Sequence, residues 1–222
     1  MHVDDLIGAH PVLYHLASRA AWPSIQRHGL LSTAALIDLF GVVADERAEM
    51  LEQVRQKSVP LAHPTHGHAI VRDQAPLKFI DRCLTEGATL PDFLSALNSR
   101  VYFWPTEDRL KRLLRARQYR DGEHVVLHVD TASLISVHGA AVELSPYNTG
   151  SVHVPNAPLR GPETFRTVSA YPYDEWRRKR GAGGDAVAEV TVLDAVPDLK
   201  EHLIQVEAWS SGMPAGMLPF ES

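Results

Sequence analysis

The chain has 222 residues, of which 45% are hydrophobic and 22% charged, a composition typical of a globular domain with a substantial core. Its 14 glycines and 15 prolines are too few for a collagen-like or disordered chain, and its single cysteine, Cys83, excludes an intrachain disulfide and a cysteine-ligated zinc site. A net charge of −5 argues against bulk electrostatic attraction to nucleic acid. We expect one domain over residues 1–222.

The sequence contains no signal for export or membrane insertion. Its first residues, Met1-His2-Val3-Asp4-Asp5, are acidic where a signal peptide is basic. No stretch approaches the roughly 20 apolar residues of a membrane span. A reducing compartment suits a chain that forms no disulfide, so we expect a cytoplasmic protein with no membrane partner.

The first half of the chain is predicted to alternate short strands and helices. A strand at residues 12–16 precedes a helix that Pro23 opens and Gly29 closes. Residues 33–57 have a helical pattern, whereas residues 58–68 hold two prolines and three histidines and are predicted to be a flexible loop insert. The pattern then favours an extended piece at 69–72, helices at 76–86, 91–98 and 107–118, and strands at 100–104 and 124–130.

Beyond Asp130 the pattern is mostly that of strands. Residues 144–185 are rich in glycine and proline and are predicted to be a second loop-rich insert, of the kind that compact domains keep for function. The chain closes with strands at 186–193 and 203–209 and a helical turn at 198–202. Strands and helices interleave without a regular βαβ period, which indicates the α+β class.

The common catalytic motifs are absent from the sequence. It has no Gly-rich phosphate loop, nucleophile elbow, His-Glu-x-x-His motif or cysteine pair, which removes the usual dehydrogenase, kinase and zinc-protease interpretations. His63, His66 and His68 carry imidazoles that zinc binds, but Pro64 and Gly67 separate them and no carboxylate stands at a fixed helical spacing. A surface loop without a metal is therefore favoured.

Three separated segments together resemble the ADP-ribosyltransferases. They are Leu13-Tyr14-His15 with residues 22–32, the aromatic run at 100–104, and residues 188–197. Their order is similar to that of the DarT-like branch, toxins that modify DNA bases, in which a histidine strand comes first, an aromatic strand follows and a glutamate strand comes late. Trp104-Pro105 stands where those toxins have Asn-Pro, which indicates an uncharacterised relative. The resemblance implies an ADP-ribosyltransferase-like split β-sandwich with N-terminal and peripheral helices.

The resemblance also implies NAD as co-substrate and names Glu189 and Arg72 as catalytic residues. A carboxylate stabilises the positive charge that develops on the ribose when nicotinamide leaves, and it can accept a proton from the attacking group. A guanidinium suits the pyrophosphate through its fork of donors. The alternatives are that Glu189 lies on the solvent face of an outer strand beside Thr191, and that Arg72 forms a surface salt bridge.

For cofactor binding the resemblance points to His15, whose imidazole would bond the adenosine ribose, and to Tyr102, whose ring would stack on nicotinamide. The same site is expected to include Tyr14, Trp104 and Asn148. Alternatively, His15 is a core histidine satisfied by the backbone and the aromatic residues only pack. Residues 148–150 and 160–165 either line this pocket or are ordinary turns.

The acceptor is expected to be a nucleobase in DNA or RNA, because a basic segment immediately precedes the glutamate strand. This segment, Arg177, Arg178, Lys179 and Arg180, runs into Gly181-Ala182-Gly183-Gly184 and is predicted to be a mobile substrate-binding loop. The alternative is that these four basic residues are only a solvent-exposed run of charges with no binding role. Such a toxin would have an antitoxin or an ADP-ribosyl hydrolase as partner. The alternative functions are a non-catalytic nucleotide- or partner-binding domain and an NAD-using RNA 2′-phosphotransferase.

Overall fold

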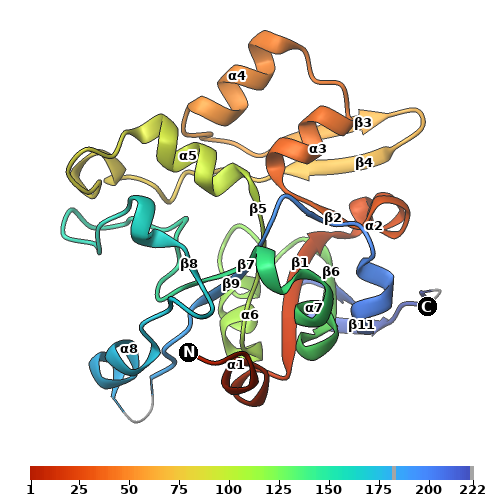
Figure 1. Ribbon diagram of the computed structural model, residues 1–222. Helices are drawn as coiled ribbons and strands as arrows, with labels where there is room; N and C mark the ends of the chain where they lie inside the picture. Colours follow the sequence, from red (N-terminus) through yellow and green to blue (C-terminus); the bar gives the residue numbers. More distant parts are fainter. Residues whose placement is uncertain (182–183, 221–222) are drawn as a thin grey trace.

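A computed structural model describes residues 1–181 and 184–220. Ala182 and Gly183 of the predicted glycine stretch lie outside these residues, as do residues 221–222. The fold is α+β, as predicted, and contains two four-stranded antiparallel sheets with helices around them (Figure 1). None of the helices within the described residues is long and apolar enough to cross a membrane.

The first sheet has the strand order β1-β6-β11-β12, and its strands are β1 (Val12–Ser18), β6 (Glu123–Asp130), β11 (Leu203–Ser210) and β12 (Met213–Met217). Its β6 strand is buried on both faces because apolar residues occupy consecutive positions. Val125 and Leu127 face the main core, and Val126 packs on the other side against Trp209 and Leu114. The strand predicted at 124–130 is thus an interior strand of this sheet.

The second sheet has the order β5-β9-β7-β8, and its strands are β5 (Arg100–Phe103), β9 (Glu189–Leu193), β7 (Val142–Ser145) and β8 (Arg166–Thr167). The β9 strand is therefore interior, paired on one side with β5 and on the other with β7. Val190 and Val192 point into the main core, and Glu189 and Thr191 share the opposite face of the strand with Tyr102, the partner of Thr191 in β5.

The two sheets meet at a single bridge between β1 and the end of β5. The backbone N–H of Tyr14 donates to the Trp104 carbonyl over 2.9 Å, and the N–H of Trp104 donates to the Tyr14 carbonyl over 2.8 Å. A short two-stranded sheet, β2 (Leu30–Leu31) with β10 (Ala195–Val196), contacts β5. The bridge brings His15 of β1 next to Tyr102 of β5.

In the described part of the chain, eight α-helices surround the sheets: α1 (Val3–Ala9), α2 (Trp22–His28), α3 (Thr33–Leu39), α4 (Ala44–Glu52), α5 (Leu90–Asn98), α6 (Glu107–Leu114), α7 (Thr131–His138) and α8 (Tyr173–Arg180). Short 3-10 helices connect them: η1 (Arg19–Ala21), η2 (Ile80–Arg82), η3 (Gly139–Ala141), η4 (Pro162–Thr164) and η5 (Leu199–His202). Figure 1 places α3 and α4 at one end of the molecule, and α1 and α8 at the other.

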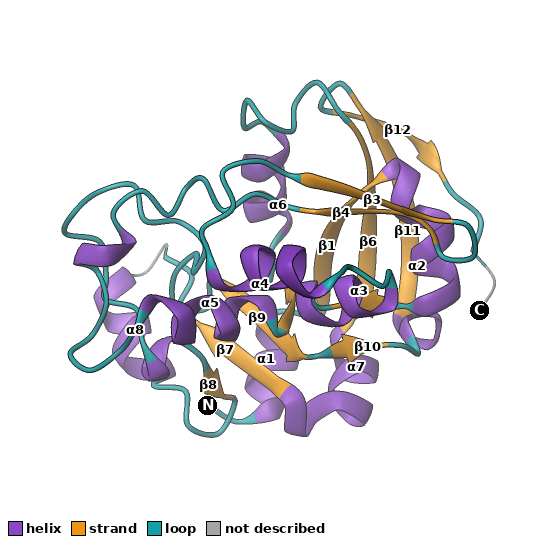
Figure 2. Cartoon of the chain, turned by 90° about the horizontal axis from the view of Figure 1, so that it is seen from above, coloured by secondary structure: helices purple, strands orange, loops and turns teal. Residues whose placement is uncertain are grey.

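Residues 58–68 are not a flexible loop insert, as the sequence predicted, but belong to a β-hairpin of β3 (Val59–His63) and β4 (Gly67–Val71). Pro60 is compatible with a strand here because the hairpin forms a separate two-stranded sheet with no interior strand. Gly67 has a φ of +77° and lets the chain turn back. Figure 2 shows the hairpin lying across β1 and β6.

Three further predictions about secondary structure need correction. The helix predicted over 33–57 is interrupted at Gly41, which adopts a φ of +66° and separates α3 from α4. The helix predicted over 76–86 is reduced to η2. The α7 helix falls where strands were expected, because the Asp130 carboxylate caps it by accepting from the Ser133 N–H over 2.6 Å.

The loop-rich insert predicted at 144–185 is mostly irregular, yet it carries β8 and α8. Its residues Val152 and Phe165 pack with Phe93 and Leu94 of α5 around Cys83, which is fully buried. This second core fixes the insert against α5, so the residues between β7 and β8 are part of the packed structure.

Candidate functional site

A cavity of about 760 Å³ opens beside the bridge between the two sheets. Its size falls within the range of small-molecule sites. Its walls come from β1, β4, β5, β9, α2 and the loop after β7. Six of the predicted site residues line it: His15, Arg72, Tyr102, Trp104, Asn148 and Glu189. The structure thus brings together residues that are 174 positions apart in the sequence (15 against 189).

Glu189 lies at the start of β9 and is 4% exposed. The alternative of a glutamate on the solvent face of an outer strand is therefore wrong. Its carboxylate accepts hydrogen bonds from the Thr149 hydroxyl at 2.7 Å and the Thr149 N–H at 3.1 Å. Burial raises the pKa of Glu189 to about 7, and the two bonds from Thr149 only partly oppose this effect. A carboxyl group with such a pKa can exchange a proton near neutral pH.

The loop that carries Thr149 is held by Arg160, which is 1% exposed. Its guanidinium donates to the carbonyls of Asn148, Thr149 and Ser151 over 3.1 to 3.3 Å, and it lies 4.0 Å from the centre of the Tyr147 ring. Of the two segments that could line the pocket or form ordinary turns, residues 148–150 line the cavity, whereas Arg160 and the rest of 160–165 do not. It supports the loop whose Thr149 fixes the Glu189 carboxylate.

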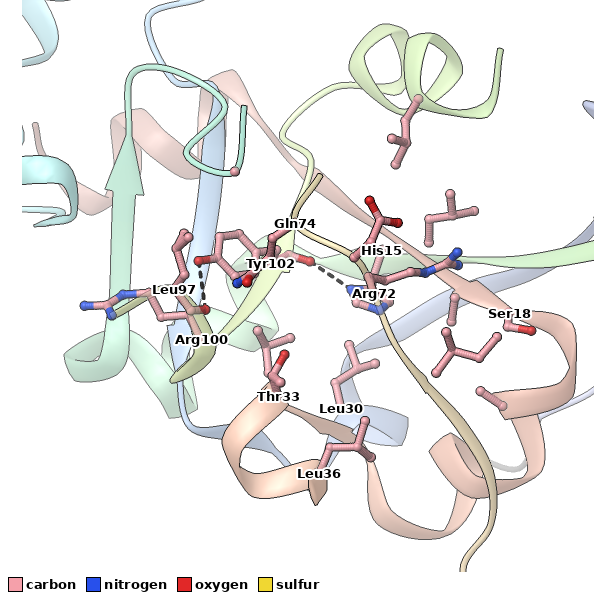
Figure 3. A pocket seen from close by; sticks show the side chains of 18 of the residues that line it. His15, Ser18, Leu30, Thr33, Leu36, Arg72, Gln74, Leu97, Arg100 and Tyr102 are labelled. Atoms are coloured by element: carbon pink, nitrogen blue, oxygen red, sulfur yellow. Dashed lines mark hydrogen bonds between the residues drawn. The ribbon is translucent and has the colours of Figure 1, made fainter. Parts of the chain in front are cut away.

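His15 has one ring nitrogen occupied by the protein and one available. Its Nδ1 lies 2.8 Å from the Tyr102 carbonyl oxygen, which can only accept, so Nδ1 carries the hydrogen (Figure 3). Burial lowers the pKa of His15 to about 4, so the ring is neutral at pH 7. The Nε2 atom is then a hydrogen-bond acceptor for which the described residues supply no donor.

Tyr102 both packs in the core and lines the cavity, so each of the two alternatives for the aromatic strand describes part of its role. Its hydroxyl donates to the Leu97 carbonyl over 3.0 Å, and its ring packs edge-on against Phe165, so it is part of the second core. The same ring also lines the cavity. Burial, and then the charge of Glu189, raises the pKa of Tyr102, which shows that the phenol and the carboxylate are near neighbours. Tyr102 is thus neutral and fixed in orientation.

Arg72 follows β4 and faces the cavity with an unsatisfied group. Its Nη2 is buried and has no hydrogen-bond partner among the described residues, and its guanidinium lies 5.0 Å from the centre of the Tyr119 ring. No ion pair with Arg72 occurs in the described part of the chain, so the surface salt bridge alternative is wrong. A buried donor without a partner is costly, and an anion in the cavity would satisfy it.

Arg55 is a site residue that the sequence analysis missed. It follows α4, inside the segment predicted to be helical, and donates to the Arg72 carbonyl at 3.0 Å and to the Asn98 side chain at 3.0 Å. Burial lowers the pKa of Arg55 to about 10. The Gln74 side chain also donates to Asn98. Arg55, Gln74 and Asn98 all line the cavity. No local motif marks them, since only the fold brings α4, β4 and α5 together.

Two predicted site elements lie outside the cavity. Tyr14 projects from the other face of β1, where it packs against the core cluster that includes Leu114 and Trp209, because neighbouring strand residues point in opposite directions. Arg177, Arg178, Lys179 and Arg180 form the end of α8 and not a mobile loop. Their helix contains an Lys179–Glu175 ion pair four residues apart, which favours the helical state. None of the four lines the cavity.

The histidines of the hairpin also differ from the expected surface loop. His63 Nδ1 accepts hydrogen bonds from the backbone N–H groups of Thr65 and His66, and His66 Nδ1 lies 3.2 Å from His28 Nε2. His68 lines the cavity. The first two imidazoles thus organise the hairpin turn and its contact with α2.

The raised pKa of Glu189 predicts how stability depends on pH. The folded protein keeps a proton that the unfolded chain releases between pH 4.5 and about 7, so this carboxyl's contribution to stability falls as the pH rises through that window and is constant above it. The loss is on the order of 3 kcal/mol. The free energy of unfolding of the parent chain, relative to Glu189→Gln, should therefore decrease from pH 4.5 to 7. Urea denaturation checks this, and the subtraction removes the opposite trend of His10, His15 and His124, whose pKa values are lowered by burial. A difference that stays constant with pH would contradict the prediction.

Comparison with known proteins identifies a family but no activity. Residues 11–203 match a family of unknown function (DUF7002), and this segment includes the cavity residues from His15 to Glu189. No curated protein matches the chain. The match extends over most of the sequence, and the chain therefore belongs to the DUF7002 family of unknown function.

Proposed function

We propose that this protein is an NAD-dependent ADP-ribosyltransferase. The observation that carries the proposal is that His15 of β1 and Glu189 of β9 line the same cavity, together with the unpartnered guanidinium of Arg72. These are the residues that the resemblance to the DarT-like enzymes assigns to NAD. A cavity of about 760 Å³ has the size expected for a dinucleotide-shaped ligand.

The sheet arrangement supports the same proposal. Two antiparallel four-stranded sheets are joined by the bridge between Tyr14 and Trp104, and strands of both sheets line the cavity, which is compatible with the split β-sandwich of ADP-ribosyltransferases. In that architecture β1 would carry the histidine and β9 the glutamate. The interior position of β9, paired with both β5 and β7, gives Glu189 a rigid backbone.

Each group in the cavity has a role in this reaction. The free Nε2 of His15 accepts a hydrogen bond from a ribose hydroxyl. The Arg72 guanidinium binds the pyrophosphate, and the Tyr102 ring packs on nicotinamide. The glycosidic bond breaks with its electron pair passing to the nicotinamide nitrogen, and the ribose carbon becomes positive. The Glu189 carboxylate stabilises that charge, and it accepts the proton of the acceptor nitrogen as the new bond forms.

The proposed acceptor is a nucleobase rather than a protein side chain. The α8 helix ends in four consecutive basic residues and is followed by the segment leading to β9, so a phosphate backbone bound along α8 would extend toward the start of that strand. The net charge of −5 disfavours the binding of nucleic acid to other parts of the protein surface. The proposed partners thus are NAD and a single-stranded or locally opened nucleic acid.

Incubation of the purified protein with NAD tests the function. We expect release of nicotinamide and, with added single-stranded DNA or RNA, a covalent ADP-ribosyl adduct detected by mass spectrometry. Adducts on protein alone would support the transferase and reject the nucleobase acceptor. Tight binding of NAD by calorimetry without turnover would replace the proposal by a non-catalytic binding module. If the protein neither binds NAD nor releases nicotinamide, the proposal is refuted.

Arg72→Leu is expected to weaken NAD binding by roughly tenfold to a hundredfold, because a charge-assisted bond to the pyrophosphate is worth about 1.5–3 kcal/mol. Calorimetric titration with NAD measures the change. Arg47→Leu is the matched control, since it removes an arginine of α4 that pairs with the largely exposed Asp38 and does not line the cavity. Equal affinities of the two variants for NAD would contradict a pyrophosphate role for Arg72.

A further inference from the structure

A second cluster of polar side chains lies between α7 and η5, away from the cavity. It consists of His138, the last residue of α7, with Asp198 and His202 at the two ends of η5. His138 Nε2 is 2.7 Å from Asp198 Oδ1, and His202 Nε2 is 3.3 Å from Asp198 Oδ2. One nitrogen or oxygen atom of each residue lies within 4.8 Å of the others. None of the three lines the cavity of the proposed active site.

His202 is held so that one ring nitrogen faces this cluster without a partner. The residue is 1% exposed, and its Nδ1 lies 2.7 Å from the Ser133 hydroxyl. Its Nε2 is buried and has no hydrogen-bond partner in the described residues, since the approach to Asp198 does not have hydrogen-bond geometry. A buried imidazole nitrogen without a partner requires a separate explanation.

The neighbours of Ser133 indicate which tautomer His202 adopts. The Ser133 hydroxyl also lies within 3.4 Å of the Glu201 carbonyl, which can only accept its hydrogen. With that bond formed, Ser133 Oγ accepts from His202 Nδ1–H, and Nε2 presents a lone pair toward the Asp198 carboxylate. Two electron-rich atoms then face each other in a buried place, an arrangement that a cation between them would stabilise.

We propose that His138, Asp198 and His202 bind one divalent transition-metal ion, with zinc as the natural occupant. Two imidazole nitrogens and a carboxylate oxygen are ligands that zinc uses, and Zn–N and Zn–O distances of about 2.0–2.2 Å place tetrahedral ligands about 3.3 Å apart. His202 Nε2 and Asp198 Oδ2 already have this separation, whereas His138 Nε2 contacts the other oxygen, Oδ1, at 2.7 Å, so a small rotation of the carboxylate or of the His138 ring must bring the three ligands onto one ion. Water from the exposed side supplies the fourth ligand.

The second coordination layer fits the same ion. Metal-bound histidines usually donate their other ring N–H to an oxygen, which orients the ring, and Ser133 fills this role for His202. Asp198 precedes η5 and follows β10, which pairs with β2. An ion bound here would tie the end of α7 to the segment that closes the β2–β10 pair. The competing interpretation is a metal-free hydrogen-bonded clamp between the same elements.

Titration of EDTA-treated protein with zinc chloride in a calorimeter separates the two interpretations. We expect one zinc ion per chain with an affinity in the micromolar range or tighter. Asp198→Asn and His138→Gln each remove one ligand and should weaken zinc binding at least tenfold. Ser133→Ala should weaken it by about tenfold through the loss of its support to His202. Cobalt(II) should give the visible absorption bands of a four-coordinate ion.

The matched control is the double variant His63→Ala with His66→Ala, which removes two imidazoles from the hairpin and leaves the α7–η5 cluster intact. It should bind zinc like the parent chain. Absence of zinc binding by the parent, loss of binding in the control, or unchanged binding in Asp198→Asn would each overturn the proposal. If Asp198→Asn fails to fold, the half-buried Ser133→Ala variant provides the decision.

Discussion

Glu189→Gln is expected to reduce nicotinamide release from NAD by about 10²–10³-fold, because it removes the negative charge that faces the developing cation on the ribose. Glutamine keeps an oxygen that accepts from the Thr149 hydroxyl and N–H, so the loop and the cavity should retain their shape. NAD affinity should therefore change little while turnover falls. Initial rates of nicotinamide release and calorimetric titration with NAD measure the two quantities separately.

The control for this loss is Glu46→Gln, which neutralises an exposed glutamate in α4 far from the cavity and should leave the rate unchanged. Turnover that survives Glu189→Gln would contradict the assigned role. It would favour the alternative of an NAD-using RNA 2′-phosphotransferase.

Gly29→Ala is expected to destabilise the fold by at least about 3 kcal/mol. Gly29 ends α2 with a φ of 71° and a ψ of −160°, a conformation that costs other residues about 1–3 kcal/mol. A Cβ here would also overlap the Val196 carbonyl and approach the Pro197 Cα to 2.6 Å. Backbone atoms cannot rotate away, so the β2–β10 pair must shift. Urea denaturation followed by circular dichroism gives the free energy of unfolding.

Gly41→Ala separates the two contributions. Gly41 has a similar φ of 66°, but a Cβ there would have nothing within 4 Å. Its substitution should cost only about 1–2 kcal/mol of conformational strain. If both variants lose the same stability, the close approach of Gly29 to β10 is not what makes glycine necessary at that position.

The sequence predicted the elements that have local signals. The helix after Pro23, the strands around Tyr102 and Val126, and the turn at 198–202 are confirmed, because proline, glycine and alternating apolar residues act over a few positions. The hairpin at 59–71 was missed because its pairing is what makes Pro60 tolerable. The α7 helix was missed because its β-branched residues favour strands, whereas the Asp130 cap and packing favour the helix.

The candidate site was predictable only where a residue carried its own signal. His15, Tyr102 and Glu189 stand in distinctive strands, and the structure brings all three to one cavity. Arg55 and Asn98 have no such signal, and they enter the cavity only because α4 and α5 pack together. The sequence did not fix which face of β1 turns toward the cavity. A shift of the strand register by one residue would place Tyr14, and not His15, on the cavity side.

The order β1-β6-β11-β12 has a consequence for biosynthesis. The strand that carries His15 is made before β6 and can pair with it once β6 has left the ribosome, but β6 remains an open edge until β11 is made. The apolar edge of β6 therefore stays exposed while residues 131–202 are made, and the two halves of the cavity come together only after β9 has been made. Such late, long-range closure favours slow folding and makes chaperone contact during translation advantageous for this topology.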